Sequence, residues 1–83
     1  MTAFDELWSR TAAAEYDSLD TARRDQVSAL VREILRHPYG VGVPQDPDGP
    51  ARDRIAATGD VTVHYQVDDL GEMVYFVRVV WRG

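Results

Sequence analysis

The last third of the chain, residues 61–82, is the feature that most limits how this sequence can fold. Apolar and polar residues alternate over Val61–Val67, with the period of two that is typical of a half-buried β-strand. Met73–Trp81 is apolar at nearly every position and rich in β-branched and aromatic residues. This composition predicts a central strand that is covered on both faces. Because only a short polar segment with one glycine separates the two strands, we predict an antiparallel hairpin.

The turn predicts a register for this hairpin. If Asp68 lies opposite Glu72, the loop has three residues, and Gly71 takes the position that requires a positive φ. The pairs are then Val67 with Met73, Tyr65 with Tyr75, Val63 with Val77, and Thr62 with Arg78. Directly opposite residues share a face, so this register collects the apolar side chains on one side of the sheet.

Residues 52–58 predict a further strand that leads through Gly59 and Asp60 into the hairpin. A two-residue turn would place Arg54 beside Tyr65 on the apolar face, whereas including Thr58 in the turn pairs Arg54 with His64. The hydrophobic pattern favours the second register. The polar face then holds Arg52, Arg54, Thr62, His64, Gln66, Arg78 and Arg82, and the apolar face holds Ile55, Val63, Tyr65, Val67, Tyr75, Val77, Val79 and Trp81.

Residues 20–37 predict an amphipathic helix, with Asp20 as the N-cap and a cation in the last turn. The residues of the apolar face follow the helical spacing throughout: Val27, Leu30, Val31, Ile34 and Leu35. Pro38 ends this helix, because the residue before a proline is forced out of the α region. Residues 39–50 are rich in proline and glycine and predict a loop.

Residues 3–19 support two interpretations. A single helix over residues 3–17 would use Thr2 and Asp5 as a capping box. Alternatively, residues 3–8 form a short strand, and Ser9 caps a helix that carries Ala12, Tyr16 and Leu19 on one face. Periodicity does not decide between them.

The length and composition restrict the classes of function. With 83 residues the chain predicts one domain, residues 1–83. It has no cysteine, and its two histidines lack metal-ligand spacing, so we expect neither disulfides nor a metal or other cofactor. No segment has the length of a membrane span or the pattern of a signal peptide, so we expect a cytoplasmic protein. The net charge of -5 argues against broad binding of nucleic acid, although all nine basic residues are arginines.

The polar face of the predicted sheet contains the candidate functional residues: Arg54, His64, Arg78 and Arg82. Guanidinium groups form paired hydrogen bonds to phosphates, and an imidazole can transfer a proton near neutral pH. Arginine stems also commonly cover the solvated face of a sheet. From the residues alone, the solvated face is the favoured interpretation.

The order of these segments resembles the RelE/ParE family of small bacterial toxins. The segments that carry the resemblance are WSRTAAAEYDSL, the helix ending LRHPYG, RDRI before Gly59-Asp60, VHYQV and VYFVRVVWR. The resemblance implies an α+β fold with a short N-terminal strand and two helices packed on one face of a C-terminal antiparallel sheet. It therefore favours the strand interpretation of residues 3–8.

The resemblance also implies a toxin of a type II toxin–antitoxin pair. In ribosome-dependent members, basic residues of the sheet and a C-terminal acid/base group cleave mRNA. Arg54 and Arg78 match basic residues of that pattern, but Thr62 stands where the family usually has arginine. The expected C-terminal His or Tyr falls on Val80 or Trp81.

Two hypotheses follow from this comparison. The favoured one is a toxin-like protein with weak or absent cleavage that acts by binding protein, namely a cognate antitoxin, gyrase or another partner. The alternative is an active endoribonuclease on ribosome-bound mRNA, with Arg54, Arg78 and Arg82 on phosphate and His64 transferring the proton. Whether the chain is an enzyme and its oligomeric state are left open.

Overall fold

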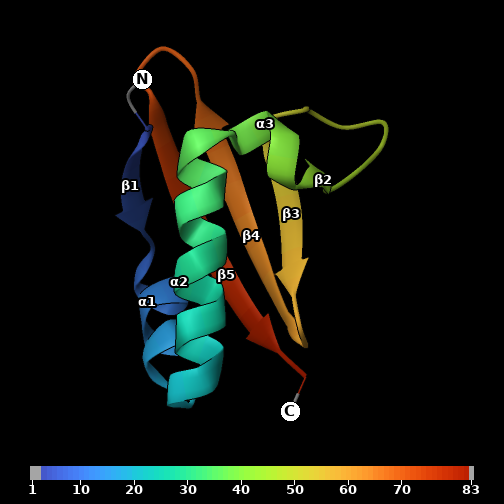
Figure 1. The fold of residues 1–83 in the computed structure, drawn as a ribbon. Coiled ribbons are helices and arrows are strands. Elements are labelled where there is room, and N and C mark those ends of the chain that lie inside the picture. The colour runs from blue at the N-terminus through green and yellow to red at the C-terminus, as the bar shows by residue number, and fades with distance from the viewer. Residues whose placement is uncertain (1–2, 83) are drawn as a thin grey trace.

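A single five-stranded sheet, in the order β1-β5-β4-β3-β2, organises the computed structural model, which describes residues 3–82 (Figure 1). The elements are β1 (Asp5–Trp8), α1 (Arg10–Asp17), α2 (Thr21–Arg36), α3 (Pro38–Val41), β2 (Val43–Pro44), β3 (Asp53–Thr58), β4 (Val61–Asp68) and β5 (Met73–Trp81). Strand β1 runs parallel to β5, and the other neighbours are antiparallel. The predicted α+β fold is confirmed, and β5 has a strand on each side as predicted. It is not covered on both faces, however, because Tyr75 and Val77 are exposed.

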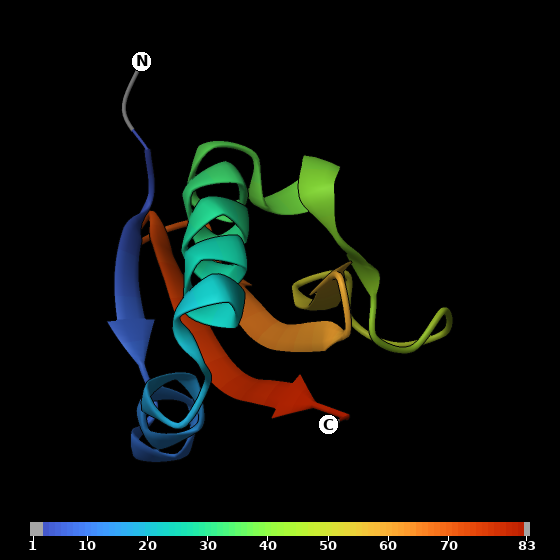
Figure 2. The same cartoon turned by 60° about the horizontal axis from the view of Figure 1, so that its bottom comes forward.

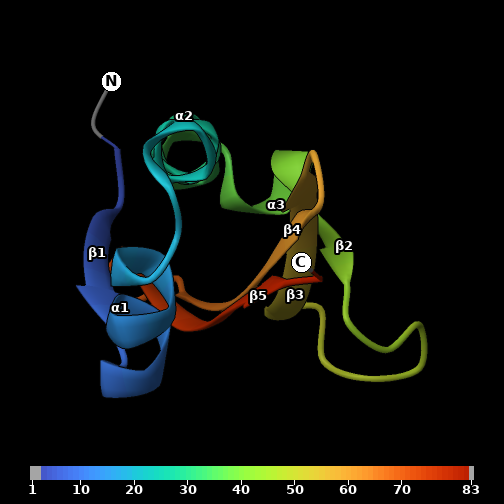
Figure 3. The same cartoon turned by 90° about the horizontal axis from the view of Figure 1, so that it is seen from below.

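Helix α2 covers one face of the sheet, as the end-on view in Figure 3 shows. Its buried residues, Val27, Val31 and Ile34, pack with Val63 and Tyr65 of β4 in one core. Burial of this apolar face, rather than helix propensity, supplies most of the stability of such a helix. Asp20 occupies the N-cap position as predicted, but its side chain makes no capping hydrogen bond. Pro38 begins the short helix α3, which continues into the segment where a loop is predicted.

The N-terminal segment follows the strand interpretation. Residues 5–8 pair with Met73–Phe76 of β5, and Ser9 caps α1 by accepting a hydrogen bond from the amide of Ala12 at 3.0 Å. Helix α1 lies at the end of β1 and beside β5 (Figure 2). A capping box would need Thr2, which lies outside the described residues. Asp5 itself is in β1, so the single-helix interpretation is wrong.

The register of the hairpin differs from the predicted one. Asp68 pairs with Met73, Gln66 with Tyr75 and Tyr65 with Phe76, one residue away from the prediction. A β-bulge then shifts the register once more, so that His64 pairs with Arg78. The positive φ in the loop belongs to Glu72, at 48°, and not to Gly71. Val74 and Phe76 are therefore buried, together with Val79, while Tyr75 and Val77, predicted in the core, are exposed.

The register between β3 and β4 is also the one that the pattern did not favour. Thr58 pairs with Val61 across a two-residue turn, in which Gly59 has a φ of 57°. Ala56 then faces the core, whereas Ile55 pairs with His64 on the other face. Arg54 pairs with Tyr65 and is buried, so its predicted place on the polar face is wrong.

Candidate functional site

The sheet face opposite α2 carries the candidate site. In the described part of the chain, no helix covers β4 and β5 on this side (Figure 3). We call this surface the open face. Its residues, several of them apolar, include Leu7, Thr62, His64, Gln66, Tyr75, Val77 and Arg78. Within it, a shallow hollow of about 270 Å³ is lined by Gln45, His64, Tyr65, Gln66, Val77 and Arg78.

His64 and Arg78 are directly opposite each other on β4 and β5. The bulge at Val77 produces this pairing, because an extra residue reverses the side on which the following side chains of β5 emerge. An imidazole and a guanidinium therefore line the same hollow. Such a pair could contact a phosphate and transfer a proton near it.

Arg78 already has an anionic partner. Its Nε lies 3.0 Å from each carboxylate oxygen of Glu15, and its Nη2 lies 2.7 Å from Oε2. The same carboxylate accepts a hydrogen bond of 2.8 Å from the backbone amide of Val79. The hydrogen bond from Arg78 is the main cause that lowers the pKa of Glu15, and partial burial opposes that shift. Glu15 thus neutralises Arg78, the side chain that the sequence analysis gives as a candidate phosphate ligand.

Arg54 lies on the other side of the sheet, away from His64. Only 5% of its surface is exposed, and its guanidinium donates to three backbone carbonyls. Nη1 bonds Ala51 O at 2.9 Å, while Nη2 bonds Tyr39 O at 3.1 Å and Gly42 O at 2.7 Å. The guanidinium carbon is also 5.2 Å from the centre of the Tyr39 ring. These contacts hold α3 and the following loop against β3, and they leave Arg54 without access to the open face.

Arg82 is exposed just beyond β5. It lies four residues after Arg78, about 13 Å along an extended chain. Its amide is 3.5 Å from Asp60 O, at the end of the sheet where β3 turns into β4. The structure therefore brings together His64 and Arg78, but neither Arg54 nor Arg82 joins them.

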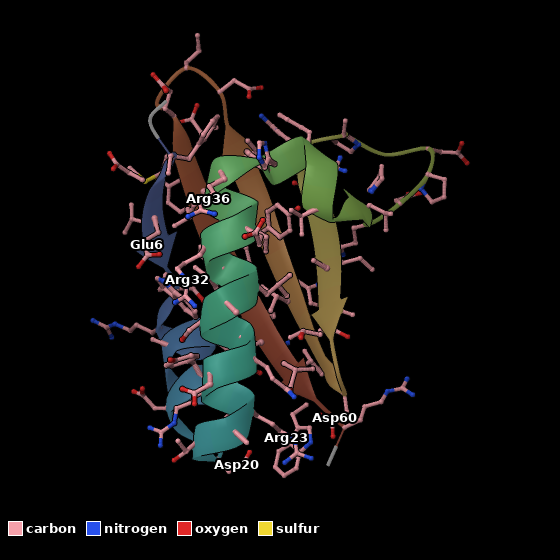
Figure 4. All side chains as sticks on the ribbon, viewed as in Figure 1. Glu6, Asp20, Arg23, Arg32, Arg36 and Asp60 are labelled. Atoms are coloured by element: carbon pink, nitrogen blue, oxygen red, sulfur yellow. The ribbon has the colours of Figure 1, made fainter. Side chains whose placement is uncertain are left out.

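A second ionic cluster surrounds Asp60. Arg23 of α2 bonds both carboxylate oxygens of Asp60, at 2.9 and 2.8 Å, and also reaches Asp20 at 3.1 Å (Figure 4). Trp81 donates to Asp60 at 3.0 Å, and its ring lies 4.3 Å below the Arg23 guanidinium. These bonds, Arg23 first, lower the pKa of Asp60 to about 2. The cluster ties the start of α2 to the end of β5, and each of its members has a partner within it.

Sequence reasoning missed Glu15. A signal was available, because Glu15 follows the buried Ala12 by three residues and therefore lies on the sheet-facing side of α1. A carboxylate at such a position needs a partner on the sheet.

Among the described residues, no group of three or more His, Cys, Asp or Glu side chains could hold a metal ion. No helix within residues 3–82 has the length and apolar character required to cross a membrane.

Neither a family model nor a curated protein sequence matches this chain. Solved structures do match. A chain of the toxin–antitoxin complex RelBE2 from Mycobacterium tuberculosis is similar with a TM-score of 0.84 and 23% identity, over 98% of this chain and 100% of that one. The isolated RelE toxin of E. coli gives a TM-score of 0.83 at 19% identity, over 98% of this chain and 86% of its own.

A YoeB/ParE toxin from Agrobacterium tumefaciens is also similar, with a TM-score of 0.76 and 19% identity, over 95% of this chain and 99% of that one. Identities this low leave the individual site residues unassigned. The three alignments each cover at least 95% of this chain. The chain therefore has the fold of the RelE toxins.

Proposed function

We propose that this chain is the toxin component of a type II toxin–antitoxin pair and acts by binding protein, with weak or absent mRNA cleavage. The structures that share its fold include the toxin–antitoxin complex RelBE2 from M. tuberculosis and an archaeal RelE–RelB complex from Pyrococcus horikoshii. A cognate antitoxin is accordingly the partner we propose for this chain. Its place of action would be the cytoplasm, where such a pair meets ribosomes and mRNA.

The observation that carries the weak-cleavage proposal is that Arg54 and Arg78, which match basic residues of the family pattern, are both already bonded within the protein. Cleavage of a phosphodiester needs cations aimed at the charge that develops in the transition state. Arg54 is buried and bonded to three carbonyls, and Arg78 is bonded to Glu15. His64 therefore lies on the open face without an arginine beside it that is free to bind a phosphate. The net charge of -5 further weakens attraction to RNA.

One observation favours the alternative, an active ribosome-dependent mRNA-cleaving toxin. His64 and Arg78 share a hollow on an exposed sheet face, and Arg78 keeps half of its side-chain surface exposed. A ribosome-bound substrate could supply the orientation that the isolated protein lacks. In that case Arg78 and His64 would act on the phosphate, while Arg54 would support them only through the fold.

The test is induced expression of the chain alone, with growth and mRNA integrity followed together. A matched strain carries His64→Ala, which removes the imidazole and leaves the buried core unchanged. We expect intact mRNA in both strains. Growth arrest with ribosome-dependent cleavage that His64→Ala abolishes would instead establish the nuclease.

The partner is tested separately, by co-expression with the product of the adjacent reading frame and affinity purification. We expect a stable complex with a small antitoxin-like protein. Failure of every adjacent product to co-purify would contradict the toxin–antitoxin assignment. The ribosome and gyrase, the other candidate partners, are tested in the same way by co-sedimentation and pull-down.

A further inference from the structure

An anion-binding position exists where α1 meets the edge of β5. Three donors converge there: Nε and Nη2 of Arg78, and the backbone amide of Val79. All three contact one carboxylate, that of Glu15, at 2.7 to 3.0 Å. A paired guanidinium fork with an added backbone amide is an arrangement that binds a phosphate oxyanion equally well.

The fold explains why a helix side chain reaches this position. Strand β1 pairs with β5 only as far as Phe76, so the edge of β5 beyond it has no neighbouring strand. Ser9 then turns the chain into α1 and donates to Val77 O at 2.8 Å. With Ala12 buried against the sheet, the next turn of α1 places Glu15 beside the amide of Val79. Glu15 therefore accepts a hydrogen bond from a backbone amide at the edge of β5 and forms an ion pair with Arg78 at the same time.

The carboxylate has a large advantage over any ligand from solution. Because Glu15 belongs to the same chain, it competes with an effective concentration of about millimolar or higher. Its carboxyl group is ionised at neutral pH, as an ordinary glutamate is, and the hydrogen bond from Arg78 lowers its pKa further. Arg78 nevertheless lies opposite His64 in the hollow and keeps 50% of its side-chain surface exposed, so a phosphate can approach it from the open face.

We propose that Glu15 is an internal competitor that occupies the phosphate position of Arg78 and thereby suppresses binding of RNA to the open face. The ligand that it displaces is the phosphodiester of a single-stranded RNA. This inference rests on the proposed function, because it gives a physical reason for the weak or absent cleavage proposed above. Glu15 is a specificity-determining residue here, not a catalytic one.

The test compares Glu15→Gln with Glu33→Gln. A glutamine at position 15 still accepts a hydrogen bond from Val79 N–H, so the edge of β5 keeps its partner while the negative charge is lost. Glu33 forms an exposed ion pair with Arg36 on α2, at 3.5 Å. Both substitutions remove one negative charge, so a difference between them reports on position and not on net charge. Thermal unfolding confirms that each variant is folded.

Binding is measured by fluorescence anisotropy with a labelled single-stranded RNA oligonucleotide at low salt and then over a salt series. We expect Glu15→Gln to bind about tenfold more tightly than wild type, since one charge-assisted contact becomes available. Glu33→Gln should bind like wild type. Adding Arg78→Ala to Glu15→Gln should abolish the gain and reduce the salt dependence.

Three results would overturn the inference: wild type and Glu15→Gln with equal affinity, an equal gain in Glu33→Gln, or a gain that survives Arg78→Ala. Co-purification of the antitoxin separates this inference from the proposed function. An antitoxin complex without any RNA effect refutes only the role of Glu15. An RNA effect without an antitoxin partner refutes only the toxin–antitoxin assignment.

Discussion

Replacing Arg54 by alanine should strongly destabilise the fold. The guanidinium donates three hydrogen bonds to the carbonyls of Ala51, Tyr39 and Gly42, and the residue is 95% buried. Each lost bond leaves a carbonyl that costs about 1–3 kcal/mol when it stays unpaired, although water can reach part of this loop. Removing the residue also recovers the cost of burying a charge. Taking about 1 kcal/mol for each carbonyl gives a loss of about 3 kcal/mol.

Urea unfolding followed by tryptophan fluorescence measures this loss, because the partly buried Trp8 stacks on the core residue Phe76, with ring centres 4.8 Å apart. With a slope of about 1 kcal/mol per molar urea for a domain of this size, the midpoint should fall by about 3 M. Arg54→Lys should fall between alanine and wild type, since one ammonium cannot reproduce the planar fork.

A control is Arg10→Ala, an exposed arginine at the start of α1, whose midpoint should stay near that of wild type. If Arg54→Ala unfolds at the wild-type midpoint, the three carbonyl contacts do not hold α3. The sequence-based assignment of Arg54 to phosphate would then regain its support, because that assignment expects a folded variant with altered RNA cleavage.

Two further predictions concern the turn and the acid limit of stability. Gly59→Ala should lower the free energy of unfolding by about 1 kcal/mol in the same urea assay, because a φ of 57° disfavours a residue with a side chain. Gly71→Ala should lower it less, since only the carboxylate of Asp68 must move. The pKa of Asp60 is lowered to about 2, so its stabilisation is present above its ordinary pKa of 3.8 and is lost as the pH falls through about 2. The melting temperature of wild type should therefore fall more steeply than that of Asp60→Asn between pH 5 and 2, and parallel curves would contradict the role of the Arg23–Asp60 pair.

Helix α2 and the start of α1 could be predicted because their signals are local, whereas β1 was favoured only by the family resemblance and α3 falls where a loop is predicted. The apolar spacing of α2 and the cap formed by Ser9 depend on residues within one or two turns of each other. The registers could not be predicted in this way. Met73–Trp81 is apolar at almost every position, so alternation does not specify which side chains face the core, and several registers look equally hydrophobic.

The register of β3 was mispredicted for a related reason. A buried arginine looks unfavourable, so the pattern favoured a turn that would leave Arg54 exposed. The carbonyls that accept hydrogen bonds from its Nη1 and Nη2 belong to α3 and to two loop residues, up to 15 positions away in the sequence. No local pattern contains that information, and the tertiary contacts reverse the preference.

The bulge at Val77 has the largest consequence for function. Without it, the register that pairs Tyr65 with Phe76 would continue, Arg78 would lie opposite Val63, and its charge would point into the core. The extra residue instead turns Arg78 outward to meet His64 and lets Val79 fill the core position. Arg78 and the adjacent amide of Val79 then meet the one carboxylate that α1 presents. The pairing of Arg78 with His64 and its neutralisation by Glu15 thus both depend on this single irregularity in β5.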